Sequence, residues 1–395
     1  MRVLFTTWAW PSHLAAMTPL AWAFQSAGHE VLVAVQPSLL PTAAKCGLLA
    51  HPIGDDVDSV AMVRQYVLPS AAGGTAPSGG GKGPRALQMF LAHTEAMTDD
   101  LVEVTRRWAP DFVVFDTTTW AGPIAAAAAG VPPVRHLYGP DLLLRAGNLL
   151  PELLAPIADR HGVSHVDPMA AVAVDPTPPS LRFPGGGDRI TMRHLPFTID
   201  SRRIIDPPPD TGKPRVLVSW GHTIAKLDPA LFPVGDIVRG LKGLDVVVAI
   251  SAAQRDLLGP LPDGVTVVED VPLDLLLPQC QLLIGHGGAA TVLTGLAHGV
   301  PQLHVPQLPD HAGHSGRVEA AGAGIVLTRD EAVTGALRVE VEELLAGERE
   351  RDNARRIAAE IAASATPAEV ARSLVAAAES ATIGLGSAPQ PAATH

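Results

Sequence analysis

Residues 2–35 read RVLFTTWAWPSHLAAMTPLAWAFQSAGHEVLVAV, and this stretch decides the fold class. Arg2–Thr6 is a short apolar run, typical of a strand buried on both faces. Leu14–Ser26 has helical spacing and is followed by Gly28, a residue suited to the end of a helix. Val31–Val35 is a second buried strand. A strand, a helix and a strand of these lengths form a βαβ unit, which predicts a parallel sheet covered by helices.

The same pattern recurs along the chain. Phe112–Phe115 is predicted to be a further strand, and an alanine-rich helix follows at Ile124–Ala129. A second series comes later, and its predicted strands are Val216–Ser219, Val246–Ile250, Val265–Val268, Leu282–Ile284 and Gln302–Val305. Helices are predicted at Glu340–Leu345, Arg356–Ala363 and Pro367–Ala378, the last with Thr366 as its N-cap and Pro367 at its first position.

These elements predict two doubly wound α/β domains with a cleft between them. The first Rossmann-like domain is expected to cover residues 1–203, and the proline-rich stretch at 204–213 is expected to be a linker. The second Rossmann-like domain is expected at 214–365. A C-terminal helix should occupy 366–383, and a disordered tail should occupy 384–395.

Composition excludes several classes of protein. The chain has 395 residues, of which 47% are hydrophobic and 17% charged, so it is not a disordered chain. Lys and Arg number 29 against 40 Asp and Glu, a net charge of −11, so no basic surplus exists to bind nucleic acid. The two cysteines, Cys46 and Cys280, cannot form a disulfide framework or a cysteine-rich zinc site, which fits a reducing cytoplasm.

The N-terminus raises the question of a signal peptide. An apolar stretch there is interrupted by Pro11-Ser12-His13, which the core of a signal sequence would not contain. No uncharged apolar run reaches the ~18 residues that a membrane span needs. The sequence therefore predicts a soluble, cytoplasmic protein that does not bind membranes.

The motif Gly285-His286-Gly287-Gly288 lies between a predicted strand and a predicted helix. Ligands bind beyond the carboxyl ends of strands in parallel sheets, and glycines there let backbone amides approach a phosphate. The helix N-terminus adds positive potential. His286 could donate a hydrogen bond or carry a charge, and Thr291 lies one turn into the helix. We interpret the motif as a phosphate-binding loop.

The same glycines also fit the dinucleotide fingerprint GxGxxA. That fingerprint requires an acidic residue near the end of the next strand, where Pro306-Gln307 stands instead. NAD is therefore not expected. Two other motifs are set aside. Asp56-Val57-Asp58 resembles a metal-binding DxD but is expected to be solvated surface, and Gly313-His314-Ser315-Gly316 resembles a nucleophile elbow but is followed by Arg317, so the GxSxG pattern fails.

His13 closes the loop after the first strand, and Asp116 ends the Phe112–Phe115 strand. In a doubly wound sheet these two positions should lie close together. A carboxylate beside a histidine fixes the imidazole tautomer and raises its basicity. The pair is therefore a candidate general base, placed across the cleft from the phosphate loop.

Three stretches then suggest a family. MRVLFTTWAWPSHLAAMTPLAWAFQSAGHEV at residues 1–31, VPLDLLLPQCQLLIGHGGAATVLTGLAHGVPQLHVPQLPDHAGHSGRVEAAGAGI at 271–325, and TPAEVARSL at 366–374 resemble the nucleotide-sugar-dependent antibiotic glycosyltransferases of actinomycetes. The resemblance is to the macrolide, spinosyn and enediyne group and spans nearly the whole chain. It implies the two-domain GT-B architecture, with the C-terminal helix crossing back to the first domain.

The resemblance also implies roles for the domains and for single residues. The first domain would bind the acceptor and the second the nucleotide sugar. His13 would be the general base of an inverting reaction, with Asp116 orienting it. Further roles implied are contacts to the donor diphosphate by Gly221, His286, Gly287, Gly288 and Thr291, to the base by Val271 and Leu273, and to the sugar by Asp310 and His311.

Two positions depart from the family pattern. Asp270 stands where many relatives have an aromatic residue, and His311 stands where many have glutamine, which fits an altered or deoxygenated sugar. The donor implied is a deoxysugar linked to thymidine diphosphate (TDP), the co-substrate of a reaction that needs no separate cofactor or metal. A hydrophobic natural product would be the acceptor. The resemblance leaves open a homodimer and a cytochrome-P450-like auxiliary protein, which some relatives need.

Alternatives of other classes are a sugar-nucleotide 2-epimerase of the same architecture and a non-catalytic auxiliary binding protein. The first would need acid–base carboxylates that replace the His13–Asp116 pair, and the second would be favoured by loss of His13 or the GHGG loop. Gly73–Pro84 is a glycine-rich segment expected to be flexible. It is either an insertion without a role or a lid over the acceptor, with Met62, Tyr66, Met89 and Phe90 supplying apolar contacts at its edges.

Overall fold

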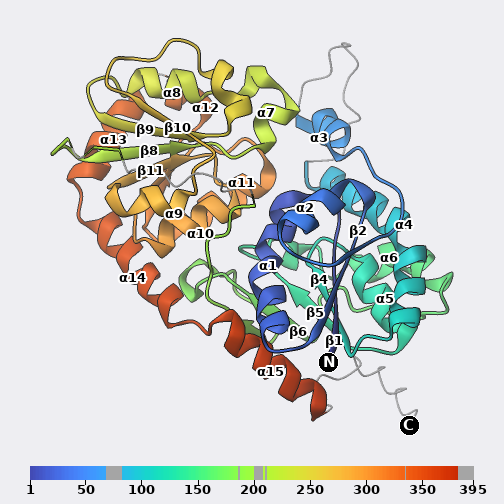
Figure 1. Cartoon of the computed structure of the whole chain (residues 1–395). Helices are drawn as coiled ribbons and strands as arrows, with labels where there is room; N and C mark the ends of the chain where they lie inside the picture. The colour runs from blue at the N-terminus through green and yellow to red at the C-terminus, as the bar shows by residue number, and fades with distance from the viewer. Residues whose placement is uncertain (68–81, 186, 200–207, 210, 334, 381–395) are drawn as a thin grey trace, which may run out of the picture.

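The computed structural model of the chain describes residues 1–67, 82–185, 187–199, 208–209, 211–333 and 335–380. It contains two sheets, each covered by helices, which stand side by side in Figure 1. All strand pairs within both sheets are parallel. The predicted pair of doubly wound α/β domains is therefore confirmed.

The first sheet has seven strands in the order β3-β2-β1-β4-β5-β6-β7. Its strands are β1 (Arg2–Thr7), β2 (Glu30–Val35), β3 (Ala50–Pro52), β4 (Phe112–Asp116), β5 (Pro133–His136), β6 (Val172–Asp175) and β7 (Arg189–Thr191). The helices around it are α1 (Pro11–Ser26), α2 (Leu40–Lys45), α3 (Ser59–Val67), α4 (Lys82–Trp108), α5 (Ala121–Ala129) and α6 (Leu150–Asp159).

The second sheet has six strands in the order β10-β9-β8-β11-β12-β13. They are β8 (Arg215–Ser219), β9 (Asp245–Ile250), β10 (Thr266–Glu269), β11 (Leu282–Gly285), β12 (Gln302–His304) and β13 (Gly324–Val326). Its helices are α7 (Thr223–Leu227), α8 (Val234–Gly240), α9 (Leu273–Leu276), α10 (Ala289–Ala297), α11 (Pro309–Ala320), α12 (Arg329–Val333), α13 (Ala336–Ala346) and α14 (Arg349–Ala363), and α15 (Pro367–Glu379) follows them.

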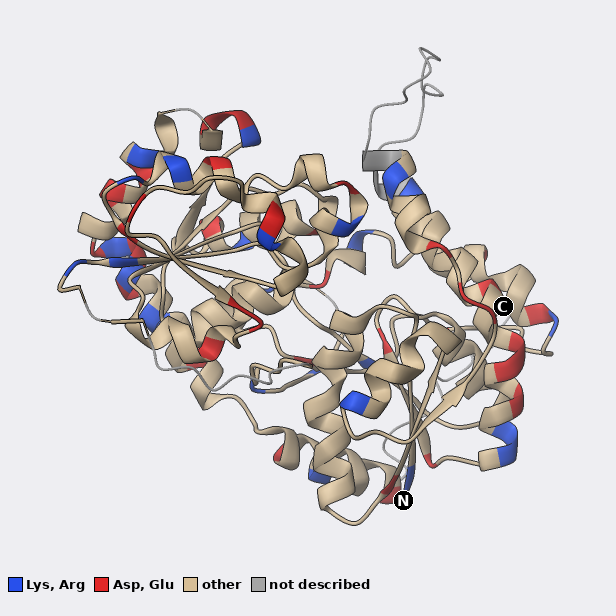
Figure 2. Ribbon diagram, turned by 45° about the horizontal axis from the view of Figure 1, so that its top comes forward, with Lys and Arg blue, Asp and Glu red and all other residues tan. Residues whose placement is uncertain are grey.

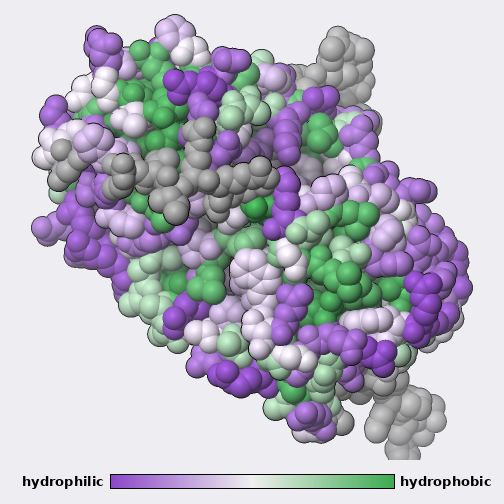
Figure 3. All heavy atoms as spheres, in the orientation of Figure 1, coloured by the Kyte–Doolittle hydropathy of each residue, from purple (hydrophilic) through white to green (hydrophobic). Residues whose placement is uncertain are grey.

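Alternation of side chains explains why the central strands are apolar throughout. In β1, Val3 and Phe5 pack into one core cluster with α1, while Leu4 packs into the cluster on the opposite face of the sheet with residues of α4 and α5. Both faces of the sheet are buried here, so every position of such a strand favours an apolar side chain. Charged residues lie mainly on the helices and loops around the sheets (Figure 2). On the face seen in Figure 3, hydrophilic residues surround and interrupt the hydrophobic ones.

Helix α15 crosses back to the first domain, as Figure 1 shows. Thr366 caps it by accepting a hydrogen bond from the N–H of Glu369, and Pro367 occupies its first turn, so the predicted N-terminus is confirmed. Val370, Ala371 and Leu374 are buried in the same core cluster as the apolar face of α1. Helix α15 therefore completes the core of the first domain.

Other contacts also join the two domains. Arg317 on α11 donates to the carbonyl oxygens of Leu181 and Arg182 at 3.0 and 2.9 Å. Arg64 on α3 donates to the carbonyl oxygens of Lys226 and Leu227 at the end of α7. Hydrogen bonds thus connect the described parts of the two domains at two separate places.

Several predictions are corrected by the structure. Helix α1 starts at Pro11 rather than Leu14, because proline is favoured at a first helical position, so His13 lies in its first turn. Helix α11 begins at Pro309, so the predicted sugar contacts Asp310 and His311 lie in its first turn. Helix α4 begins at Lys82, inside the glycine-rich segment Gly73–Pro84, whose residues 73–81 lie outside the described part of the chain.

Other expectations concern residues for which little is described. The tail at 384–395 and residues 204–207 and 210 of the linker at 204–213 lie outside the described residues. At the end of that linker, Arg215 donates to the carbonyl oxygen of Pro208 at 3.0 Å and pairs with Asp245 at 3.1 Å. Within the described residues, no helix is long and apolar enough to cross a membrane.

Candidate active site

The strand order reverses at one place in each sheet, and the candidate residues gather at these places. In the first sheet β1 lies between β2 and β4, so His13, which follows β1, and Asp116, which ends β4, are neighbours. In the second sheet β8 lies between β9 and β11, so Gly221, which follows β8, faces His286, which follows β11. Ligands bind at such switch points in open α/β sheets.

The predicted contact between His13 and Asp116 is present. His13 Nδ1 lies 3.0 Å from Asp116 Oδ2, and both side chains are buried. The other carboxylate oxygen accepts hydrogen bonds from the N–H and the hydroxyl of Thr118. Because a carboxylate only accepts, His13 must carry its proton on Nδ1, which leaves the lone pair on Nε2.

The electrostatics of the pair favour an ionised carboxylate. Burial by itself raises the pKa of Asp116, but the adjacent His13 and the hydrogen bonds from His13 and Thr118 outweigh burial and hold the pKa below its ordinary value. The carboxylate is therefore ionised at pH 7 and stabilises positive charge on His13.

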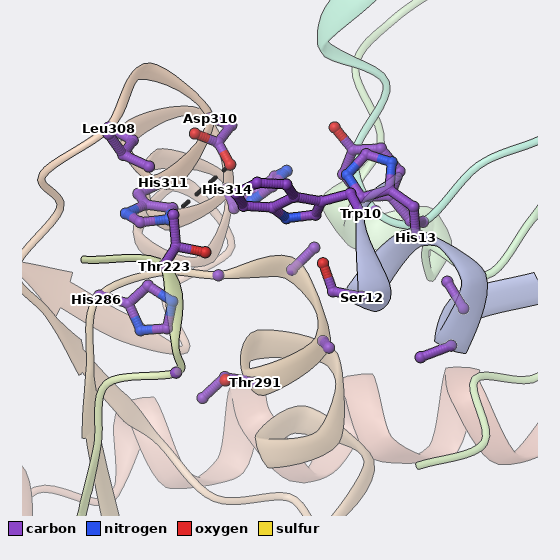
Figure 4. Close-up of a pocket in the computed structure, with 18 of the residues that line it drawn as sticks. Trp10, Ser12, His13, Thr223, His286, Thr291, Leu308, Asp310, His311 and His314 are labelled. Atoms are coloured by element: carbon purple, nitrogen blue, oxygen red, sulfur yellow. Dashed lines mark ion pairs between the residues drawn. The ribbon is translucent and has the colours of Figure 1, made fainter. Parts of the chain in front are cut away.

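Aromatic rings enclose His13. The ring of Trp8 lies 5.2 Å away edge-on, and that of Tyr138 lies 4.3 Å away. Tyr138 in turn lies 6.3 Å from the ring of His314 on α11 of the second domain, and His314 Nδ1 lies 3.1 Å from the carbonyl oxygen of Gly287. This chain of contacts places His13 opposite the GHGG loop across one cleft, as Figure 4 shows.

The GHGG loop has the geometry that its glycines require. Gly287 has a φ of +87°, and a Cβ atom there would lie 2.2 Å from the hydroxyl oxygen of Ser315 and 2.8 Å from the carbonyl oxygen of His311. Gly288 is the N-cap of α10, and Thr291 lies in the first turn of that helix. Both line the cleft, whereas Gly287 lies behind the loop against α11.

Buried histidines surround His286. Its ring lies 4.5 Å from the ring of His311 and 6.1 Å from that of Trp220. Burial, together with the neighbouring histidines, holds the pKa of His286 well below its ordinary value. His286 is therefore neutral at pH 7 in the free protein, and it can offer an N–H donor to a ligand.

Asp310 and His311 occupy the first turn of α11 and line the cleft. His311 Nε2 lies 3.9 Å from Asp310 Oδ2. Burial raises the pKa of Asp310, but His311 and His314 outweigh it and hold the pKa below its ordinary value. Burial lowers the pKa of His311 although Asp310 opposes it. A carboxylate acceptor and a neutral imidazole thus stand side by side.

The remaining residues of the second domain lie as follows. Gly221 has a φ of +59°, and a Cβ atom there would lie 2.9 Å from the His286 ring. Val271 and Leu273 line the cleft beyond it. Between β10 and Val271, Asp270 has a φ of +54°, which is uncommon for a residue other than glycine and typical of functional loops.

The cleft between the domains encloses about 2010 Å³, and both His13 of the first domain and His286 of the second line it. On the side of the first domain, Met89 and Phe90 are among the described residues that line it, and Met62 is not, because it packs against the core of that domain. The side chain of Tyr66 lies outside what the structure describes.

Two residues near the site were not singled out from the sequence. Tyr138 lies after β5, and no local pattern marks it. His314 belongs to the GHSG motif, which the sequence analysis sets aside, yet it lines the cleft and its Nδ1 contacts the carbonyl oxygen of Gly287 in the GHGG loop. Asp56 and Asp58 of the DxD motif are exposed, as expected, and bind their own surroundings: Asp56 accepts from the hydroxyl of Ser38, and Asp58 accepts from the N–H of Ala61 in α3. No group of three or more potential metal ligands occurs among the described residues.

Comparison with known proteins extends these observations. Residues 22–202 match the family described as "Erythromycin biosynthesis protein CIII-like, N-terminal domain", and residues 239–377 match its C-terminal domain. The chain is 32% identical to the TDP-daunosamine transferase DnrS of Streptomyces peucetius, over 95% of this chain and 96% of the relative. It is 36% identical to the L-demethylnoviosyl transferase of Streptomyces niveus, over 95% and 98%.

Solved structures agree. The crystal structure of the glycosyltransferase VinC in complex with DTDP matches with a TM-score of 0.77 and 32% identity, over 96% of this chain and 100% of that one. The spinosyn rhamnosyltransferase SpnG complexed with spinosyn aglycone matches with a TM-score of 0.80 and 27% identity, over 95% and 100%. Fold and cleft together define a glycosyltransferase of GT-B architecture. The chain belongs to the erythromycin biosynthesis protein CIII-like family of antibiotic deoxysugar glycosyltransferases.

Proposed function

We propose that this protein transfers a deoxysugar from a TDP-sugar to a hydroxyl group of a natural-product aglycone, with inversion at the anomeric carbon. The observation that carries the proposal is the His13–Asp116 pair, 3.0 Å apart, facing the GHGG loop across a single cleft. The first domain would hold the acceptor and the second the donor. The VinC structure is a complex with DTDP and the SpnG structure a complex with spinosyn aglycone, which supports a TDP-linked donor and an aglycone acceptor.

In the proposed reaction, His13 Nε2 removes the proton from the acceptor hydroxyl while the oxygen attacks the anomeric carbon. The bond from that carbon to the diphosphate oxygen breaks on the opposite face, and the electron pair leaves with the diphosphate. Asp116 stabilises the imidazolium that forms. The N-terminus of α10 and the N–H of His286 stabilise the charge on the diphosphate, so the scheme routes no step through a metal.

Asp310 and His311 are proposed to contact the sugar. Val271 and Leu273 are proposed to contact the nucleobase of the donor. Because His311 is neutral, it can donate one hydrogen bond and accept another, but it lacks the second N–H of a glutamine amide. This difference favours a sugar with fewer hydroxyl groups to satisfy. Met89 and Phe90 are proposed to contact the acceptor.

The test is an assay with labelled TDP-rhamnose and a panel of hydroxylated polyketide aglycones, including the spinosyn aglycone. Formation of a glycoside with inverted anomeric configuration supports the proposal. An isomerised nucleotide sugar would indicate an epimerase, and binding without turnover would indicate an auxiliary protein. His13→Ala should lower kcat by about two to four orders of magnitude. Its affinity for TDP, measured by calorimetry, should stay the same, and EDTA should leave the wild-type rate unchanged.

A further inference from the structure

A group of buried polar side chains lies behind the catalytic pair and has no part in the reaction as described so far. His93 on α4 and Gln36 after β2 are fully buried, and Ser59 at the start of α3 is nearly so. His93 Nδ1 lies 2.9 Å from Gln36 Oε1, and His93 Nε2 lies 2.8 Å from the Ser59 hydroxyl. Both ring nitrogens of this histidine are therefore occupied.

The hydrogen bonds fix the direction of each group. Gln36 Nε2 donates to the carbonyl oxygen of Asp55 at 2.6 Å, which turns the amide oxygen toward His93. That oxygen only accepts, so His93 carries its proton on Nδ1 and accepts from Ser59 at Nε2. Gln36 Oε1 also accepts the backbone N–H of Ala9 at 2.9 Å. The network thus holds the middle of the Trp8–Trp10 turn.

The ring of His93 lies against Trp8, with ring centroids 4.6 Å apart. Trp8 reaches the catalytic pair in two ways. Its ring lies edge-on to His13 at 5.2 Å, and its indole N–H donates at 2.8 Å to the hydroxyl of Thr118, which donates to Asp116. Trp10, which lines the cleft, stacks on Trp8 at 5.1 Å. Trp8 therefore lies between His93 and His13 and contacts both.

We infer that His93 is a positioning residue for glycosyl transfer: anchored by Gln36 and Ser59, it holds Trp8 and the Trp8–Trp10 turn in the place that orients His13 toward the acceptor hydroxyl. The inference rests on the proposed role of His13. Burial, followed by His13, lowers the pKa of His93 to about 4 although Asp56 opposes them, so the ring stays neutral and keeps its acceptor for Ser59.

The test compares three variants on one helix. His93→Leu keeps the bulk but removes both anchors, His93→Asn keeps an N–H for Gln36, and Thr105→Val is a matched control whose hydroxyl donates only to Leu101 of its own helix. The assay uses TDP-rhamnose and the aglycone of the panel that the wild type glycosylates. A small displacement of a catalytic group costs about 100-fold in rate.

We expect His93→Leu to lower kcat by about 10- to 100-fold with an unchanged Kd for TDP. His93→Asn should recover most of this loss, and Thr105→Val should behave as the wild type. In a His13→Ala background, His93→Leu should cause no further loss. A folded His93→Leu protein with the kcat of the wild type would overturn the inference, as would an equal loss in His93→Asn. If His93→Leu does not fold, Ser59→Ala removes one anchor and should lower kcat by a smaller factor, whereas an unchanged kcat there would also overturn the inference.

A readout without turnover separates this inference from the proposed function. Hydrogen exchange of the Trp8 indole N–H, assigned by NMR with Trp8→Phe, should become faster in His93→Leu than in the wild type. Unchanged exchange would overturn the positioning role. Normal turnover in His13→Ala would instead overturn the assignment of the base, whatever the exchange rate of Trp8.

Discussion

At the scale of single residues, the site depends on charges and conformations that its surroundings impose. The carboxylate of Asp116 is kept ionised in a buried place by one histidine and one threonine. The lowered pKa means that this ionised group stabilises the fold above the ordinary carboxyl pKa of about 3.9. The contribution is lost as the pH falls through the lower value of the folded protein.

Asp116→Asn should lower kcat by about two to four orders of magnitude, because an amide can present its N–H to His13 and stabilise the wrong tautomer. Steady-state kinetics with TDP-rhamnose would measure the loss. Asp58→Asn is the control, since an asparagine can still cap α3, and its kcat should match that of the wild type. A similar loss in both variants would point to a general effect on folding.

Gly287→Ala should destabilise the fold by about 1–3 kcal/mol, because the φ of +87° strains any other residue and the new Cβ would collide with Ser315. The shifted loop should also bind TDP more weakly, as calorimetry would show. Gly316→Ala is a matched change in α11 with open space around it, and it should stabilise the helix by up to about 1 kcal/mol. If Gly287→Ala binds TDP normally, the loop tolerates the side chain and the argument from its geometry is wrong.

At the scale of elements, helix α15 belongs to the core of the first domain. Leu374 of α15 is fully buried there, in the cluster that contains the apolar face of α1. Leu374→Ala should lower the free energy of unfolding by about 2–5 kcal/mol, and hydrogen exchange should locate the loss in α1 and β1. Ser373→Ala lies next to it on the exposed face and should change stability by less than about 0.5 kcal/mol.

An equal effect of the two substitutions would mean that α15 does not stabilise the first domain. Exchange that increases only in the second domain would contradict the prediction in the same way.

At the scale of the whole molecule, neutral buried histidines should make the protein sensitive to acid. Burial lowers the pKa of His136 and His194 to about 4, and that of His304 to about 3. Below pH 6.5 the unfolded chain binds protons on these rings and the folded protein does not, so stability falls as the pH falls. Each such histidine contributes up to about 1.4 kcal/mol per pH unit.

Thermal unfolding between pH 8 and pH 5 should therefore show a steep loss of Tm that begins near pH 6.5. His304→Gln keeps a donor for Gln302 and removes one titrating group, so its stability should depend less steeply on pH. A variant with the pH dependence of the wild type would show that His304 does not contribute. A Tm that stays constant across this range would contradict the prediction as a whole.

The central strands and the sites that follow them could be predicted from the sequence because their signals are local. Val3, Leu4 and Phe5 are buried on both faces, so the strand is a continuous apolar run. At the point where the strand order of the sheet reverses, the carboxyl ends of β1 and β4 are neighbours, and this brings His13 and Asp116 together. Short strands such as β3 and β13 have three residues each, which is too little for a pattern, and they form because a neighbouring strand supplies their hydrogen bonds.

What the sequence determined by itself was the class of fold, the position of the GHGG loop between a strand and a helix, and the closeness of His13 and Asp116. Each of these depends on residue types within a strand or just after it. Only the tertiary structure decided that His286 is neutral, because that follows from burial among His304, His311 and His314, which other elements supply. The same holds for Tyr138 between the two sites and for His93 behind Trp8. The positions of these residues depend on packing between elements that are far apart in the sequence. The sequence around each residue has no local pattern that predicts such packing.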